Sequence, residues 1–242
     1  DKNGQKMSKR LGNAVDPFQT LSDFGPDATR WYMISNSNPW DNLKFDLGGV
    51  DEVKRKFFGT LYNTYSFFAL YANIDGFKYD EKEIMFDQRP ELDRWILSEL
   101  NSLIINVDEY YNDYEPTKAA RAINSFVIDN LSNWYVRLSR RRFWKGDYEK
   151  DKISAFQTLF DVLLNIAKLS APISPFFMDR LFIDLSKNLN QSFSESIHLE
   201  NFPVADKSKI DKKLEEKVKY AQTISSLTLS LRAKEKIKVR QP

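Results

Sequence analysis

Apolar residues recur at steps of three and four along most of this chain, which is the period of one face of an α-helix. The clearest stretch begins near Val50 and ends at Asp75-Gly76, and the next runs from Glu91 to a break at Pro116. The same period predicts further helices over about 117–145, 153–170, 175–185 and 210–231. The pattern therefore predicts a protein that is mainly α-helical.

The apolar stripe of each helix supplies the candidate core. Its positions are expected to face the interior of a helical bundle, because burying such a stripe is what stabilises an amphipathic helix in water. They include Phe57, Leu61, Phe68, Leu100, Leu103, Val107, Tyr114, Ile123, Leu131, Trp134, Leu138, Phe156, Phe160, Leu163, Ile224 and Leu231.

Capping and breaking residues divide the chain. Asp16-Pro17 and Ser174-Pro175 each predict an N-cap followed by proline in the first helical turn, and Gly25-Pro26 predicts a boundary between two short helices. Leu43 and Phe45 alternate with polar neighbours and predict a brief extended stretch, and the closing KIKVRQP alternates like a strand edge. The expected fold is a helical bundle preceded by a small mixed segment. Its expected parts are residues 1–49, 50–190 and 191–242.

The net charge and the cysteine and histidine counts limit which binding and metal sites this chain can form. The formal net charge is only +2, so any nucleic-acid contact must use a local basic patch rather than a global field. The chain has no cysteine and one histidine, His198, which excludes disulfides and cysteine- or histidine-rich metal sites. We therefore expect no metal site in this chain, and no apolar run reaches the length needed to span a membrane.

A lysine-rich loop, KMSKR, occupies residues 6–10 and includes Met7 and Ser8. Lys6 and Lys9 lie three residues apart between Gly4 and Gly12, so two ammonium groups on such a loop could close over a triphosphate and offset the charge that develops during reaction. Lys6 and Lys9 are thus the candidate catalytic and ATP-binding residues. The alternative on spacing alone is a solvated terminus, because short lysine motifs are frequent.

A second basic stretch, NWYVRLSRRRFWK, covers residues 133–145 and contains no acid. On a helix Arg137 and Arg141 share one face, and Arg140 and Trp144 share another. Arginine binds phosphate bidentately and an exposed tryptophan can stack on an unpaired base, so this helix is a candidate RNA surface. The alternative is that the arginines pair with acids of neighbouring helices. The candidate RNA-binding residues are Arg137, Arg140, Arg141, Arg142, Trp144 and Lys145.

Several motifs together resemble a known family. KMSKRLGNAVDP resembles the second signature loop of the class I aminoacyl-tRNA synthetases, with Arg10 where that signature has serine. GPDATRWYMISNSNPWDNLKFD, ELDRWILSEL, NWYVRLSRRRFWKGDY, APISPFF and LRAKEKIKVRQP extend the likeness over the whole chain, and their combination resembles the isoleucyl-tRNA synthetases. The valyl and leucyl enzymes share the same plan and stay as alternatives.

The resemblance implies an enzyme that uses ATP, with Mg²⁺, to join isoleucine to its tRNA through isoleucyl-adenylate. It implies that Lys9, assisted by Lys6, contacts the ATP phosphates. It also implies that the segment up to about Gly49 contacts the inner side of the L-shaped tRNA and that the bundle binds the anticodon stem-loop. The implied partner is isoleucine tRNA, and the implied location is cytoplasmic, without a membrane.

The other ATP signature of this class, H-x-G-H, needs two histidines, and this chain has one. No editing domain is recognisable either. We therefore expect a C-terminal piece of the enzyme that binds tRNA but does not form adenylate alone. A different class of function stays open at this stage: a non-enzymatic helical interaction domain whose basic face binds an acidic protein.

Overall fold

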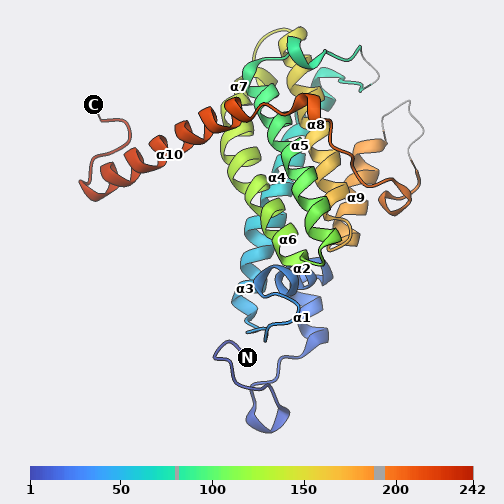
Figure 1. Ribbon diagram of the computed structural model, residues 1–242, viewed down its shortest axis with the longest axis vertical. Helices are drawn as coiled ribbons and strands as arrows, with labels where there is room; N and C mark the ends of the chain where they lie inside the picture. The colour runs from blue at the N-terminus through green and yellow to red at the C-terminus, as the bar shows by residue number, and fades with distance from the viewer. Residues whose placement is uncertain (80–81, 188–193, 242) are drawn as a thin grey trace.

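The computed structural model describes residues 1–79, 82–187 and 194–241, and within them the regular structure is helical, with no strand. Figure 1 shows a tall bundle, with the N-terminal segment at one end and one long helix projecting from the other. The prediction of a mainly α-helical bundle is confirmed. The helices are α1 (Pro17–Phe24), α2 (Pro26–Asn36), α3 (Leu47–Val53), α4 (Gly59–Asp75), α5 (Glu91–Asn112), α6 (Pro116–Ser125), α7 (Arg137–Trp144), α8 (Lys150–Ser170), α9 (Pro175–Ser186) and α10 (Lys212–Lys234).

Two stretches of π-helix join helices into continuous rods. The first, η2 (Lys54–Phe58), links α3 to α4, and the second, η4 (Phe126–Val136), links α6 to α7. Short 3₁₀ turns occur at η1 (Lys9–Leu11), η3 (Phe86–Gln88), η5 (Ile197–Leu199) and η6 (Lys207–Lys209). The α5 helix packs against α6 and α8, while α8 also packs on α4, α7 and α9. The bundle therefore forms around α5 and α8.

The predicted N-cap residues and prolines lie at the starts of α1, α2 and α9. Asp16 accepts hydrogen bonds from the backbone N–H groups of Phe18 and Gln19 at 2.8 and 3.1 Å, as an N-cap should. Ser174 is the N-cap residue of α9 with proline after it, as predicted, but its hydroxyl donates to the Ser170 carbonyl of the preceding turn at 3.1 Å and makes no capping hydrogen bond. Asp27 of α2 accepts from the Phe177 N–H at 2.5 Å in its place. This bond ties the short N-terminal helices to the bundle.

The core is rich in aromatic side chains, as the stripes predict. Trp31 stacks on Phe57 with ring centroids 4.1 Å apart, and Phe143 meets Phe156 edge to face at 5.1 Å. The largest fully buried side chains are Trp31, Trp95, Tyr135, Phe57, Phe143, Phe156, Phe160, Phe182, Leu61, Ile96, Ile123 and Leu131.

Four predicted core positions are wrong: Tyr114, Leu138, Ile224 and Leu231 are 83%, 56%, 63% and 63% exposed. Tyr114 lies beyond the end of α5 with a positive φ of 57°. Leu138 follows η4, and the wider π-helical turns of η4 shift later residues out of the 3.6-residue period. Leu138 therefore lies on the outer face of the rod rather than on the inner stripe. Ile224 and Leu231 lie in the C-terminal half of α10, where residues 223–231 are all exposed.

Among the described residues, neither predicted extended segment joins a sheet. Near Phe45 the backbone is held by the Tyr32 hydroxyl, which donates to the Lys44 carbonyl at 3.0 Å and accepts from the Asp46 N–H at 3.1 Å. The closing segment turns back, and Arg232 donates to the Lys238 carbonyl at 2.6 Å. Side-chain bonds to the backbone replace strand pairing in both places, so the N-terminal segment is helical rather than mixed.

Candidate nucleic-acid interface

The KMSKR loop is closed by side chains at its two ends. Asn13 accepts from the Ser8 N–H at 2.8 Å and donates to the Lys6 carbonyl at 3.2 Å. The Ser8 hydroxyl accepts from the Leu11 N–H at 3.2 Å, and Gly12 ends the turn at φ 65°, a value that favours glycine. The loop thus has a defined turn, although it contains no buried residue from Lys6 to Arg10.

Lys6, Lys9 and Arg10 are exposed. Within residues 1–79, 82–187 and 194–241, no hydrogen bond or ion pair engages their charged groups. These cations are therefore free to meet an anion. Their role toward ATP stays a prediction.

The predicted RNA residues lie at the other end of the bundle, because α7 is far from the N-terminal loop in Figure 1. Arg137, Arg140, Arg141 and Lys145 are exposed, and Trp144 is 64% exposed. In the part of the chain that the structure describes, their charged groups form no ion pair. We call these five residues the α7 surface. Unpaired guanidinium groups beside an exposed indole suit phosphate and base contacts.

Arg142, the last arginine of the triplet, is occupied. Its guanidinium donates to both carboxylate oxygens of Asp93 on α5, at 2.6 and 2.8 Å, and to Asp151 at 3.0 Å. Burial opposes its charge, yet the hydrogen bonds and charge of Asp93 raise the pKa of Arg142 above its ordinary value. For this residue the structural alternative holds, so Arg142 is a structural residue and is left out of the α7 surface.

Asp93 is the residue that the sequence motifs did not single out for this role. It is fully buried and also accepts from the Tyr135 hydroxyl at 3.0 Å and the Ser154 hydroxyl at 2.6 Å. An ionised carboxylate is stable in the interior only with such partners. The network connects α5, η4, α7 and α8, and it fixes the orientation of α7. The available sequence signal for this buried role was the position of Asp93 within the otherwise apolar stripe of ELDRWIL.

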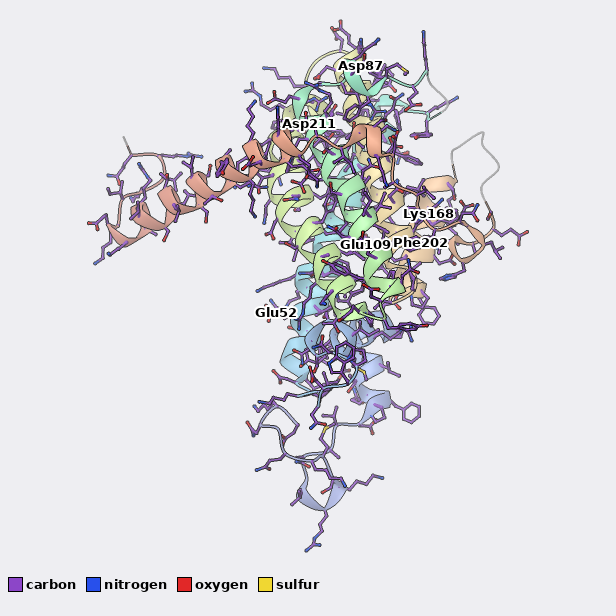
Figure 2. The ribbon with its side chains drawn as sticks, viewed as in Figure 1. Glu52, Asp87, Glu109, Lys168, Phe202 and Asp211 are labelled. Carbon is purple, nitrogen blue, oxygen red and sulfur yellow. The ribbon has the colours of Figure 1, made fainter. Side chains whose placement is uncertain are left out.

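Trp134, predicted to be core, is only partly buried and lines a groove of about 790 Å³ between η4 and α10. The α10 helix begins at this end of the bundle, where Asp211 caps it by accepting from the Leu214 N–H at 3.0 Å (Figure 2). Glu215 then fixes α10 to α5, accepting from the Ser98 and Ser102 hydroxyls at 2.6 and 2.7 Å. The groove and the α7 surface therefore share the same rod, α6–η4–α7.

Metal-ligand clusters and long apolar helices were sought among the described residues. No group of three histidine, aspartate or glutamate side chains there could hold a metal ion. Likewise, none of the helices in those ranges combines the length and apolar character that crossing a bilayer requires.

Comparison with known families decides what kind of chain this is. Residues 93–242 match the family described as the anticodon-binding domain of tRNA ligase. The chain belongs to this family. Residues 1–46 match the class I tRNA synthetases of the I, L, M and V group, so the KMSKR loop lies within a synthetase segment. The resemblance that the motifs carry is confirmed.

The relatives of this chain are longer proteins. It is 63% identical to the isoleucine–tRNA ligase of Porphyromonas gingivalis and 47% identical to that of Dehalococcoides mccartyi strain CBDB1. All 242 residues are matched in both cases, but they make up 21% and 24% of the two relatives. The chain thus spans about a fifth of the length of its relatives.

A solved structure shows the same fold. The LeuRS of Agrobacterium radiobacter K84, in a ternary complex with tRNA and LeuAMS, matches with a TM-score of 0.65 at 21% sequence identity. The match covers 87% of this chain and 24% of that one.

Proposed function

We propose that this chain is the tRNA-binding part of an isoleucine–tRNA ligase. The longer protein would use ATP, with Mg²⁺, to join isoleucine to its tRNA. The observation that carries the proposal is the α7 surface: four unpaired cationic side chains around an exposed tryptophan, in a chain of the anticodon-binding family.

The α7 surface has the chemistry that an RNA loop requires. Guanidinium groups neutralise phosphates and release counterions, which makes binding fall with salt, and Trp144 offers a stacking platform for a base. The buried pair of Arg142 with Asp93 holds the helix that displays these groups. Because the whole chain carries a net charge of only +2, RNA binding depends on this local concentration of charge.

The proposal assigns separate tasks to the two ends of the bundle. Lys9 and Lys6 would contact the ATP phosphates in the longer protein. Residues 1–49 would contact the inner side of the tRNA, 50–190 its anticodon stem-loop, and 191–242 would continue into a further region. Acceptance of isoleucine and ATP would require the catalytic part of that longer protein.

A charge-removal experiment tests the proposal. The variant Arg137→Ala/Arg140→Ala/Arg141→Ala is compared with the wild type in a salt titration of binding to isoleucine tRNA. A plot of the logarithm of the binding constant against the logarithm of the salt concentration has a negative slope, and each lost phosphate contact should make that slope shallower by about 0.7–0.9. The matched control Lys207→Ala/Lys213→Ala/Lys234→Ala removes the same charge from exposed positions outside the segments proposed to contact tRNA, and it should leave the slope unchanged.

Equal affinity and slope in the wild type and the arginine variant, with both folded by circular dichroism, would exclude the α7 surface as the RNA site. If the wild type binds no tRNA but binds an acidic protein through the α7 surface, the alternative of a non-enzymatic helical interaction domain is favoured instead.

A further inference from the structure

A small pocket lies between α4, α8 and α9, and none of its lining residues belongs to the α7 surface. We call it the α4–α9 pocket. Its volume of about 220 Å³ is below the range of about 300–1,000 Å³ that is usual for ligand sites. That volume equals the share of about seven waters in the liquid, so the pocket has room for a small molecule but not for a nucleotide. The α4 wall is uncharged, because Asp75 at the end of α4 is its first charged residue.

The inner part of the pocket is aromatic, and its rings hold one another in place. The Phe68 ring centroid lies 6.1 Å from that of Phe77 and 6.2 Å from that of Phe160. Tyr79 packs on Phe160 with centroids 4.2 Å apart, and its hydroxyl donates to Asp161 on α8. Phe68 and Phe160 are both buried. This part of the pocket therefore favours an apolar group of a ligand, because removing apolar surface from water is stabilising.

The mouth of the pocket carries one carboxylate and one ammonium group. Asp184 accepts from Lys187 Nζ and from Arg180 Nε, each at 2.8 Å. Burial opposes the charge of Asp184, yet hydrogen bonds from Lys187 and Arg180 hold its pKa below the ordinary value, so the carboxylate is ionised. A carboxylate offers about four acceptor sites and an ammonium group three donors, so both groups keep unused capacity. Among the described residues, the Tyr65 hydroxyl and the Asn73 amide at this mouth make no hydrogen bond.

We propose that the α4–α9 pocket binds a free α-amino acid with an apolar side chain. The side chain packs on the aromatic rings, Asp184 accepts from the α-ammonium group, and Lys187 donates to the α-carboxylate. Asp184 and Lys187 together carry no net charge. A zwitterion therefore satisfies both, whereas a simple cation or anion is attracted by one and repelled by the other. This site goes beyond the proposed function and does not depend on RNA binding.

Isothermal titration calorimetry of the 242-residue chain with L-leucine tests the proposal. Leucine should bind saturably. Glycine lacks the side chain and should bind about ten- to a hundredfold more weakly, which is the usual effect of burying one aliphatic side chain. Two analogues of leucine each lack one charge: 3-methylbutylamine has no carboxylate, and 4-methylpentanoate has no ammonium group. Both should bind more weakly than leucine.

Two variants connect the binding to this pocket. Lys187→Gln removes an exposed ammonium group and should weaken leucine binding with little effect on stability, because exposed ion pairs contribute little. The matched control Lys118→Gln breaks another exposed pair at the same spacing, Lys118 with Glu115, and should bind leucine like the wild type. Ala69→Leu places a larger side chain on the pocket wall and should abolish leucine binding while the chain stays folded by circular dichroism.

The α4–α9 pocket proposal is overturned if the wild type shows no saturable leucine binding, or if glycine or either singly charged analogue binds as tightly as leucine. Wild-type affinity in Lys187→Gln, or in folded Ala69→Leu, would also overturn it. None of these results bears on the proposed function, which is tested separately by the salt titration of the α7 surface.

Discussion

Replacing Asp93 by alanine should be one of the most destabilising single changes in this protein. The carboxylate is fully buried and accepts four hydrogen bonds, two of them from Arg142 at 2.6 and 2.8 Å and the others from Tyr135 and Ser154. Alanine leaves a guanidinium in the interior facing two hydroxyl groups. Only the bonds of Arg142 to Asp151, which is largely exposed, would remain.

The magnitude follows from the asymmetry of buried ion pairs. Removing one partner typically costs about 3–5 kcal/mol, because the other charge stays desolvated without compensation. For a protein of this size that corresponds to a fall in Tm of about 6–20 °C. Replacing both partners by apolar residues of similar volume is often close to neutral.

The assay is urea unfolding followed by far-UV circular dichroism, on Asp93→Ala, Arg142→Ala and the double variant Asp93→Leu/Arg142→Met. Both single variants should lose about 3–5 kcal/mol, and the double variant should recover most of that loss. A loss below about 1 kcal/mol in Asp93→Ala would refute the view that this pair fixes α7. So would a double variant less stable than either single one.

Three further predictions concern pH and backbone packing. Burial raises the pKa of Asp161 from 3.8 to about 6, so the folded state holds this proton more tightly, and stability should rise as the pH falls from about 6 toward 4. Hydrogen bonds from Lys168 and Ser194 lower the pKa of Glu200 from 4.5 to about 2, so its contribution should be lost as the pH falls from about 4.5 toward 2. In unfolding experiments across pH, Asp161→Asn and Glu200→Gln should each remove one of these trends, and an unchanged profile would contradict the assignment. A Cβ at Gly49 would lie 2.3 Å from the Tyr32 ring, so Gly49→Ala should cost about 1–3 kcal/mol in thermal unfolding. The matched change Gly59→Ala, whose nearest such neighbour is 3.6 Å away, should instead be neutral or stabilise by up to about 1 kcal/mol, and equal effects would contradict this reasoning.

The helices were predictable because their signals are local. The spacing of apolar residues shows its period within one or two helical turns. Capping pairs such as Asp16-Pro17 and Asp75-Gly76 act over the same short range, so the sequence alone located where helices begin and end. Motif order was equally informative about family, since several motifs in the same order leave little room for chance.

The candidate site was predictable only in part. Composition around α7 indicated a basic surface, but it did not separate Arg142, whose partner Asp93 lies 49 residues away, from its exposed neighbours. A 3.6-residue period predicts Leu138 on the inner stripe, and the π-helical turns of η4 altered that phase.

By itself the sequence determined which segments are helical, where they end, and that lysines and arginines concentrate in two places. Tertiary structure alone decided which arginine is used for packing, that Asp27 caps a helix 150 residues away, and that α10 leaves the bundle to form a groove. The physical reason is that helix formation depends on neighbours in the chain. The fate of a charged or half-apolar side chain depends instead on the partners that folding brings to it.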